Sequence, residues 1–374
     1  QQRNQSMSGS NLSVGIVGLP NVGKSTLFNA LLKKQVALAA NYPFATIEPN
    51  VGVVEVPDER LLQLAKVTAA SEKLTSLPPL KYALVEFVDI AGLVAGASKG
   101  EGLGNKFLAN IRQTDAICHV LRHFSDPNVL REGSIDPEQD LAIIRTELQL
   151  ADLETLQKQN QAKGAVSKAE KLRWETIQNF LAQIERGQSL ICTSETEKIV
   201  AKELCLLTAK PEIFAINVDE KELARTQELT RFFAEKLQVA ASQIVIIAAK
   251  IESELATLAI DDQELYMQEL GIKASGLSRL AAVAYQTLGL QSFLTTGAIE
   301  TKAWTIKRGA TAVEAAGVIH TDFSKKFISA KIVSVTDFIK IGGWSACKEM
   351  GKLRQEGRDY IMQDGDVVEF MIGK

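Results

Sequence analysis

The sequence is poor in the residues that build disulfide frameworks and metal centres. Its 374 residues include three histidines and four cysteines, and the cysteines stand at positions 118, 192, 205 and 347. No two cysteines form a Cys-x-x-Cys pair, and no histidine completes a metal-ligand spacing with them. This pattern argues against disulfides and zinc, and it predicts buried thiols in a reducing compartment.

The chain also lacks a long apolar run and an excess of either charge. No stretch is long enough to span a bilayer, so no membrane partner is expected. The net charge of -3 gives no global signal for nucleic acid, although a local basic patch could still bind it. Residues 1–11 are polar and are expected to form a disordered leader, with Met7 as a plausible start. We expect a cytoplasmic monomer, or an organellar protein if a transit peptide has been removed.

Short apolar runs that alternate with helical patterns dominate the first part of the chain. This alternation is typical of a largely parallel sheet covered by helices, and the abundant Val and Ile predict strands buried on both faces. Helices are expected from Lys24 and over residues 220–237. The expected strands are 13–18, 51–56, 82–90, 116–122, 211–218 and 243–249.

One connection in this pattern is too long for a loop. About ninety residues separate the strands expected at 116–122 and 211–218. Apolar residues recur within them at helical spacing, so an inserted, coiled-coil-like helical hairpin is expected at 136–210. Strands with few helices follow from residue 289, which predicts a small α+β domain at 289–374. Residues 12–135 and 211–288 then form the main α/β domain.

The segment GLPNVGKS, residues 18–25, follows an expected strand and precedes an expected helix. It matches the phosphate-binding loop G-x-x-x-x-G-K-[ST] in the required context. Glycines let backbone N–H groups approach a phosphate, and the helix N-terminus favours negative charge. Lys24 is expected to reach the β- and γ-phosphates, and the Ser25 hydroxyl to ligate Mg²⁺. The nucleotide contacts are expected from Gly18, Leu19, Pro20, Asn21, Val22, Gly23, Lys24, Ser25 and Thr26.

A second phosphate-site motif ends the strand expected at 82–90. Asp89 and Gly92 form a D-x-x-G pair, in which the acid can hold Mg²⁺ and the glycine N–H can meet the γ-phosphate. Thr46 is a candidate for the switch threonine that closes on the metal and the γ-phosphate, and a plain loop role is its alternative. Leu93 stands where related switches place a water-orienting Gln, so hydrolysis is expected to be slow.

Two further residues are weaker candidates. His119 lies in an apolar strand, where a histidine is more often a core residue than a catalyst, although near phosphates it could position water. The amide oxygen of Asn21 could help to hold a monovalent cation such as K⁺ beside the phosphates.

The segment NVDE, residues 217–220, stands where many nucleotide switches have Asn-Lys-x-Asp, whose Asp accepts hydrogen bonds from guanine. Val218 removes the packing cation, and Glu220 is one methylene longer than Asp. Adenine offers neither of the guanine donors, so these changes are expected to weaken guanine recognition, although Glu220 could also substitute for Asp. Asn217 can hold the neighbouring loops or meet the base. The next loop is expected to line the base pocket through Ala248, Ala249 and Lys250.

These motifs together carry a family resemblance. The segments GIVGLPNVGKSTLFNALL, NYPFATIEPNVGVVEVPDERL and FVDIAGLVAGASKGEGLGNKFLANIR, with NVDE, closely resemble the YchF subfamily of Obg-like P-loop ATPases, in the TRAFAC class. The tail, with AGVIHTDFSKKFISAKI and GKLRQEGRDYIMQDGDVVEF, is similar to that subfamily's TGS domain. The resemblance runs from about residue 12 to the end, more in placement than in sequence over the helical insertion.

The resemblance implies a β-grasp fold for the TGS domain and a nucleotide switch that binds ATP as well as or better than GTP. It implies slow hydrolysis with Leu93 in place of the catalytic Gln, and assistance by His119. It also implies association with ribosomes and ribosomal RNA, in translation or stress responses. Lys325, Lys326 and Lys331 are candidates for RNA contact, and a solvated face is their equal alternative.

We therefore expect Mg²⁺-dependent hydrolysis of ATP to ADP and phosphate. Lys24, Thr46, Gly92 and His119 are the residues expected to act in hydrolysis, and Ser25, Thr46 and Asp89 are the expected metal ligands. One alternative is a GTP-specific translational GTPase. The other is a ribosome-binding protein whose binding is gated by nucleotide and in which hydrolysis only resets the state.

Overall fold

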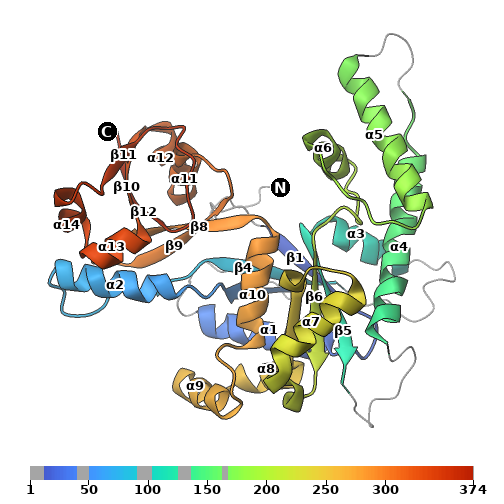
Figure 1. Ribbon diagram of the computed structural model, residues 1–374, viewed down its shortest axis with the longest axis horizontal. Coiled ribbons are helices and arrows are strands. Elements are labelled where there is room, and N and C mark those ends of the chain that lie inside the picture. The colour runs from blue at the N-terminus through green and yellow to red at the C-terminus, as the bar shows by residue number, and fades with distance from the viewer. Residues whose placement is uncertain (1–11, 40–49, 91–102, 125–135, 162–166, 374) are drawn as a thin grey trace. The chain divides into compact units, whose positions relative to one another are not determined.

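The computed structural model describes residues 12–39, 50–90, 103–124, 136–161 and 167–373 (Figure 1). The expected leader at residues 1–11 lies outside this part of the chain, and so do the predicted site residues Thr46, Gly92 and Leu93. None of the described helices is both long and apolar enough to cross a membrane.

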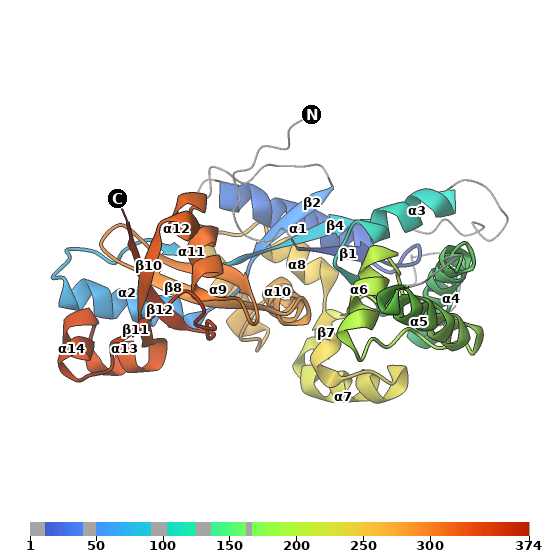
Figure 2. The same ribbon diagram turned by 90° about the horizontal axis from the view of Figure 1, so that it is seen from above.

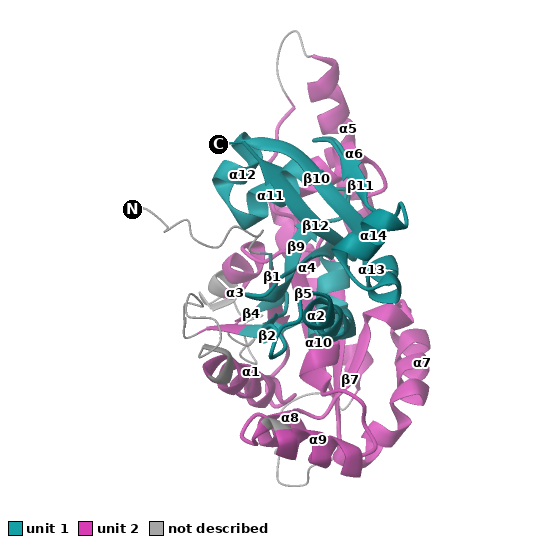
Figure 3. Ribbon diagram, turned by 90° about the vertical axis from the view of Figure 1, so that its left-hand side faces the viewer, with its two compact units in different colours: residues 1–12, 53–86, 281–374 teal, residues 13–52, 87–280 magenta. Residues whose placement is uncertain are grey.

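The chain groups into two compact units, which Figure 3 shows in different colours. The larger unit comprises residues 13–52 and 87–280. The smaller unit comprises residues 1–12, 53–86 and 281–374. The domain boundaries expected from the sequence stay a prediction, and each unit is described by itself below.

A six-stranded sheet has the order β2-β4-β1-β5-β6-β7. Its strands β1, β5, β6 and β7 belong to the larger unit, whereas parts of β2 and β4 fall within residues 53–86 of the smaller unit. The pairs β1–β5, β5–β6 and β6–β7 are parallel, and Val17 of β1 is in register with His119 of β5. Every residue of β1 and β7 is buried, as expected for strands rich in Val and Ile. The predicted α/β class is confirmed. The strands are β1 Ser13–Val17, β2 Val51–Glu55, β4 Leu84–Asp89, β5 Ala116–His123, β6 Glu212–Val218 and β7 Ile244–Ile247.

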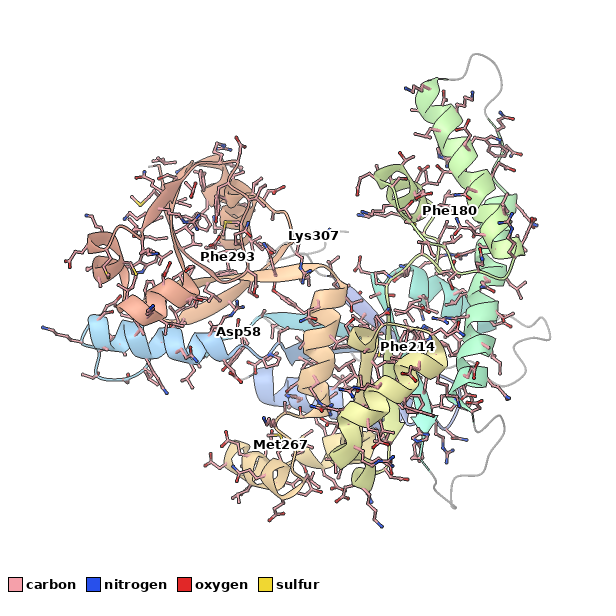
Figure 4. All side chains as sticks on the ribbon, viewed as in Figure 1. Asp58, Phe180, Phe214, Met267, Phe293 and Lys307 are labelled. Atoms are coloured by element: carbon pink, nitrogen blue, oxygen red, sulfur yellow. The ribbon has the colours of Figure 1, made fainter. Side chains whose placement is uncertain are left out.

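Two helices beside this sheet, α1 and α8, begin at residues predicted for the site, Lys24 and Ala249. The helix α1 begins at Lys24, as predicted, and packs against α8 (Figures 1 and 2). The helix α7 packs on β7, and its Phe233 is fully buried in one core with Phe214 of β6, which Figure 4 labels. These helical elements are α1 Lys24–Ala39, α3 Leu103–Arg112, η2 Glu220–Arg225, α7 Thr226–Leu237, η3 Ala241–Gln243, α8 Ala249–Leu255, α9 Ile260–Glu269 and α10 Gly276–Thr287.

The long connection between β5 and β6 is helical, as predicted, with α4 Pro137–Gln157 and α5 Lys168–Glu185 packed together. A third helix that the sequence did not predict, α6 Glu195–Glu203, packs on α5. Phe180, labelled in Figure 4, is fully buried in the core that these helices share. Each helix starts at a side-chain cap, because Asp136, Ser167 and Ser194 accept bonds from the first helical turns.

The carboxylate of Asp152 in α4 joins this helix to the last residues of the helical insertion, just before β6. It accepts hydrogen bonds from the backbone N–H of Leu207 and of Thr208, each at 2.8 Å. The Thr208 hydroxyl donates a third at 2.8 Å. Because Asp152 is fully buried, these three bonds replace the water that it loses.

The smaller unit contains a mixed sheet in the order β11-β10-β12-β8-β9-β3. The helix α11 packs on β9 and β10, and Phe293 lies in their shared core (Figure 4). The strand-rich composition expected from residue 289 is confirmed. The segments KAWTIKRG, FISAKIVS and GDVVEFMIG predict the strands β9, β10 and β12, and the helical pattern near residues 311–316 predicts α11. The sequence did not predict β3, β8, β11 or α12 to α14. The elements are β3 Leu80–Lys81, β8 Leu290–Thr296, β9 Thr301–Lys307, α11 Ala312–Ile319, α12 Thr321–Lys325, β10 Phe327–Ser334, α13 Val335–Ile341, α14 Trp344–Glu349, β11 Arg354–Glu356 and β12 Asp366–Ile372.

A helix from early in the chain belongs to this smaller unit. The helix α2, Glu59–Ser71, packs on β8 and β9, and β3 pairs with β9. Arg60 at its start donates to both Asp58 and Asp364 at 2.7 Å. No sequence pattern indicated that residues 53–86 join the C-terminal strands.

The cysteines follow the sequence prediction in part. Cys118 and Cys347 are buried, and burial raises the pKa of the Cys118 thiol to about 12. Cys205 is exposed, so the prediction of buried thiols is wrong for that residue.

Candidate nucleotide-binding site

The segment of residues 18–23 connects β1 to α1 as a tight loop. Gly23 has a φ of 92°, and a Cβ at this position would overlap the amide nitrogen of Asn217. Asn21 also adopts a left-handed conformation, with a φ of 63°. Only glycine combines this backbone with this close approach, so position 23 requires it. The loop therefore delivers the chain directly into the first turn of α1, where backbone N–H groups favour an anion.

Lys24 and Asp89 meet beside this loop. The Lys24 ammonium lies 2.5 Å from a carboxylate oxygen of Asp89 and also donates to the carbonyl of Ile90 at 2.9 Å. Lys24 is nearly buried, whereas the Asp89 side chain is 27% exposed. The end of β4 that carries Asp89 is held by backbone bonds from Asp89 to Asn50 and from Ile90 to Ile16. Two motifs 65 residues apart are thus brought together, as the sequence predicted.

Oxygen donors of the kind that Mg²⁺ prefers stand at this point. The Ser25 hydroxyl is on an exposed residue in the first turn of α1, and the Asp89 carboxylate faces the same lysine that precedes Ser25 in the chain. P-loop nucleotide hydrolases generally use Mg²⁺, held by this pair of residue types. The donor chemistry of Ser25 and Asp89 fits that ion.

Asn217 joins the phosphate loop to the loop that follows β7. Its amide nitrogen donates to the Val22 carbonyl at 2.9 Å, and its amide oxygen accepts from the Ala249 N–H at 2.9 Å. Asn217 is only 5% exposed. Both ends of the amide are therefore used inside the protein, which assigns Asn217 the loop-holding role of the two that the sequence left open.

The two altered positions of the NVDE segment have different surroundings. Val218 is 4% exposed and packs in the core beside α7, so a lysine could not be accommodated there without burying its charge. Glu220 is exposed and begins η2, where its carboxylate is accessible. The loop expected at residues 248–250 is shorter than predicted, because α8 already begins at Ala249. Ala248 and Ala249 are buried and Lys250 is exposed. Of the residues predicted to surround the base, Glu220 and Lys250 are therefore the ones with exposed side chains.

Glu252 is a functional candidate that the sequence analysis missed. It is 3% exposed, and its carboxylate accepts from the backbone N–H groups of Gly276 at 2.6 Å and Leu277 at 3.2 Å. Burial raises the pKa of Glu252, and the two backbone bonds oppose this. Glu252 lies in the first turn of α8, so its two bonds link this helix to the start of α10. The sequence of α8 is mixed in polarity, so nothing in it distinguished Glu252 from the neighbouring acid Glu254.

Arg122 is a second residue that the sequence did not single out. It is 8% exposed in β5, its guanidinium lies over the Phe124 ring at 4.2 Å, and it approaches the Asn21 carbonyl at 3.5 Å. A charged residue inside an apolar strand was the signal. Arg122 places a buried positive charge next to the phosphate loop.

His119 has a different environment. Its Nε2 lies 2.9 Å from Glu212, and its ring stacks on Phe214 with centroids 5.3 Å apart. Arg145 of α4 donates to the other Glu212 oxygen at 2.6 Å. Burial alone would raise the pKa of Glu212, but His119 and Arg145 lower it to about 2. Glu212 begins β6, at the opposite end from Asn217, and its contact with Nε2 fixes the position of the His119 ring. The role of His119 in hydrolysis stays a prediction.

Comparisons with known proteins place this site in a family. Residues 13–218 match a family model described as "50S ribosome-binding GTPase", and residues 290–373 match the model "YchF-GTPase_C", described as a protein of unknown function.

Curated relatives are similar over almost the whole chain. The protein of Bacillus subtilis called "Ribosome-binding ATPase YchF" is 44% identical and covers 96% of this chain and 98% of its own. The protein of that name from Escherichia coli O157:H7 is 45% identical with the same coverage. A solved structure of the Schizosaccharomyces pombe YchF GTPase superposes with a TM-score of 0.83 at 34% identity, over 97% of this chain and 98% of that one. The chain therefore belongs to the YchF family of P-loop nucleotide-binding proteins.

Proposed function

We propose that this protein binds ATP and slowly hydrolyses it to ADP and phosphate, and that the bound nucleotide governs its association with the ribosome. The meeting of Lys24 and Asp89 at 2.5 Å beside the glycine-dependent loop carries this proposal. An ammonium that could bind the phosphates and a carboxylate that could hold a metal lie together at the N-terminus of α1, which supports the proposal.

The chain's own residues would act on the phosphates by position and charge. The backbone N–H groups from Gly18 to Ser25 would bind the phosphate oxygens, and Lys24 would exchange Asp89 for the β- and γ-phosphates. Arg122 behind the loop adds positive potential. Water adds to the γ-phosphorus as the bond to the ADP oxygen breaks. The predicted contributions of Thr46 and Gly92 would complete the γ-phosphate contacts.

Ser25 and Asp89, with Thr46, are the proposed ligands of Mg²⁺. When bound, the ion would neutralise charge on the β- and γ-phosphate oxygens. The proposed K⁺ ligand is Asn21, whose left-handed backbone in the exposed part of the loop supports a position near the phosphates.

The preference for adenine is proposed from the base end of the site. Asn217 is occupied by Val22 and Ala249, and Val218 is buried. Glu220 alone would then have to read guanine from an exposed position. The printed names of the bacterial relatives, which call them ATPases, support the same substrate.

The ribosome is the proposed partner because those names also describe ribosome binding. A monomer acting in the cytoplasm is proposed with it, and an organellar location is the alternative.

Calorimetric titration of the nucleotide-free protein with non-hydrolysable ATP and GTP analogues tests the substrate. We expect tighter binding of the ATP analogue. A tenfold preference for GTP, about 1.4 kcal/mol, would favour the GTP-specific alternative. Phosphate release that is measurable but slow, well below about 1 per second, is expected. Ribosome binding that differs between ATP and ADP, with no phosphate release above that of ATP alone, would favour the non-catalytic gated binding protein.

A further inference from the structure

A cavity of about 760 Å³ opens in the larger unit away from the phosphate loop. It lies where η2 and the first turns of α7 face residues 271–274 and the start of α10. Four cationic side chains line it, namely Arg225, Arg231, Lys273 and Arg279, together with a single carboxylate, Glu228. In a chain with a net charge of -3, this is a local concentration of positive charge.

The charge of the cavity is only partly neutralised by the protein. Arg225 pairs with Glu228 at 2.6 Å and with Glu222 at 3.2 Å. Arg231 and Lys273 are exposed, and neither forms an ion pair within the part of the chain that the structure describes. The mouth of the cavity therefore presents two uncompensated cations on two different elements.

Arg279 holds the inner wall of the cavity. Its Nη2 donates to the Ile246 carbonyl at 2.8 Å, on the edge strand β7, and its Nε is buried without a hydrogen-bond partner among the described residues. Burial lowers the pKa of Arg279, but an arginine stays charged at neutral pH. The half-buried guanidinium has no hydrogen-bonded carboxylate among the described residues, although the negative charge of Glu252 acts on it, and it adds to the positive potential of the cavity.

We infer that this cavity binds phosphate groups of an RNA backbone, an inference that rests on the ribosome association proposed above. Guanidinium and ammonium groups bind phosphate oxygens strongly, and Arg231 and Lys273 can each meet one. No aromatic side chain lines the cavity among the described residues, so it offers no surface on which a base could stack. Recognition would therefore use the backbone charge, which ribosomal RNA supplies as a repeating array.

Two lysines of the smaller unit that the sequence offered for RNA contact are paired with acids, unlike Arg231 and Lys273. Lys331 pairs with Glu369 at 2.9 Å, and Lys325 lies 4.0 Å from Asp322. The positive charge of these two lysines is partly balanced within the protein, so they are weaker candidates for RNA contact than Arg231 and Lys273. Lys326 is exposed and forms no ion pair among the described residues, and it stays a candidate.

The test measures co-sedimentation of the full chain with purified ribosomes over a series of KCl concentrations. The double variant R231E/K273E reverses the two cations, and R231Q/K273Q neutralises them. The matched control K171E/K202E reverses two exposed lysines on α5 and α6. Thermal unfolding and ATP-analogue affinity of each variant show whether the fold and the nucleotide site are intact.

We expect R231E/K273E to weaken ribosome binding at least about tenfold, and R231Q/K273Q to lower the slope of log affinity against log salt by about 2, one per cation. The control should stay within about threefold of the unchanged protein, since it lies outside the cavity. Unchanged binding by R231E/K273E, or an equal loss in the control, would overturn the inference while leaving the ribosome association intact.

Naked ribosomal RNA is the second probe. The unchanged protein should bind it, and R231E/K273E should bind it more weakly. If only intact ribosomes are bound, the partner of the cavity is a ribosomal protein, and the RNA inference is wrong. If the unchanged protein binds neither probe, the proposed ribosome association fails as well.

Discussion

The phosphate end and the base end of the nucleotide site are built in opposite ways. At the phosphate end the site depends on the path of the backbone, because Gly23 fits closely against Asn217. Its lysine, Lys24, is already held in place by Asp89. At the base end the side chains that would contact a base either make contacts inside the protein or are exposed to solvent. Asn217 holds two loops and Val218 fills the core, which leaves Glu220 at the surface.

This difference indicates why one end tolerates change and the other does not. A substitution in the phosphate loop disturbs backbone positions that several elements share. A substitution at Glu220 alters one exposed carboxylate and nothing that the fold depends on. We therefore expect substitutions at the proposed base end to alter nucleotide preference more readily than phosphate binding.

The largest effect is expected from Gly23→Ala. The new methyl group would overlap the Asn217 amide, and a φ of 92° is strained for alanine. Nucleotide affinity should fall at least about a hundredfold, or roughly 2.7 kcal/mol, in calorimetric titration. Gly187→Ala is the matched control, because Gly187 has a φ of 73° with open space around it. Equal losses in both variants would show that backbone strain, rather than the contact with Asn217, is responsible.

Asn217→Ala should weaken the contact of Asn217 with the phosphate loop and its contact with the start of α8 together. It leaves the buried Ala249 N–H without an acceptor, which costs about 1–3 kcal/mol of unfolding free energy. Denaturant unfolding measures the loss, and titration with ATP and GTP analogues should show affinity falling for both by a similar factor. A selective loss of one nucleotide would mean that Asn217 contacts the base directly.

Glu220→Asp tests the base end alone. The shorter carboxylate restores the acid that reads guanine, and we expect the ratio of GTP to ATP affinity to rise about tenfold, or 1.4 kcal/mol. Glu222→Asp is the control, since Glu222 pairs with Arg225. An unchanged ratio in the Glu220 variant would remove this residue from base recognition.

The smallest effect concerns Glu212, at the opposite end of β6 from Asn217. Its ordinary pKa of 4.5 falls to about 2 in the folded protein. A depressed carboxyl pKa stabilises the fold above the unfolded value, and this stability is lost as the pH falls toward 2. Lowering the pH from 5 to 3.5 should cost about 1 kcal/mol of unfolding free energy through this group.

Glu212→Gln should remove that part of the pH dependence and leave ATP affinity unchanged. Denaturant unfolding at a series of pH values checks the first outcome. A fall in ATP affinity would instead connect Glu212 and His119 to the nucleotide site.

The sequence predicted the parts of the site whose chemistry is local. The loop of residues 18–25, the start of α1 at Lys24 and the acid at Asp89 were predicted because glycine spacing and strand ends are visible in the residue order. Glu252 and Arg279 were not predicted, because their roles depend on partners in α10 and β7 that only folding brings near. The pairing of α2 with β8 and β9 escaped prediction for the same reason.

The hydrogen bonds of Asp152 to Leu207 and Thr208 have a consequence for how the helical insertion can change in sequence and length. They close the helical insertion at its base, since Asp152 and Leu207 are 55 residues apart in the chain yet share a hydrogen bond. The cost of closing a loop rises only slowly with its length, so once its ends are pinned, residues at the far end are free to lengthen or diverge. The insertion can thus be remodelled or exchanged as a module, while β5 and β6 keep their register and the nucleotide site keeps its shape.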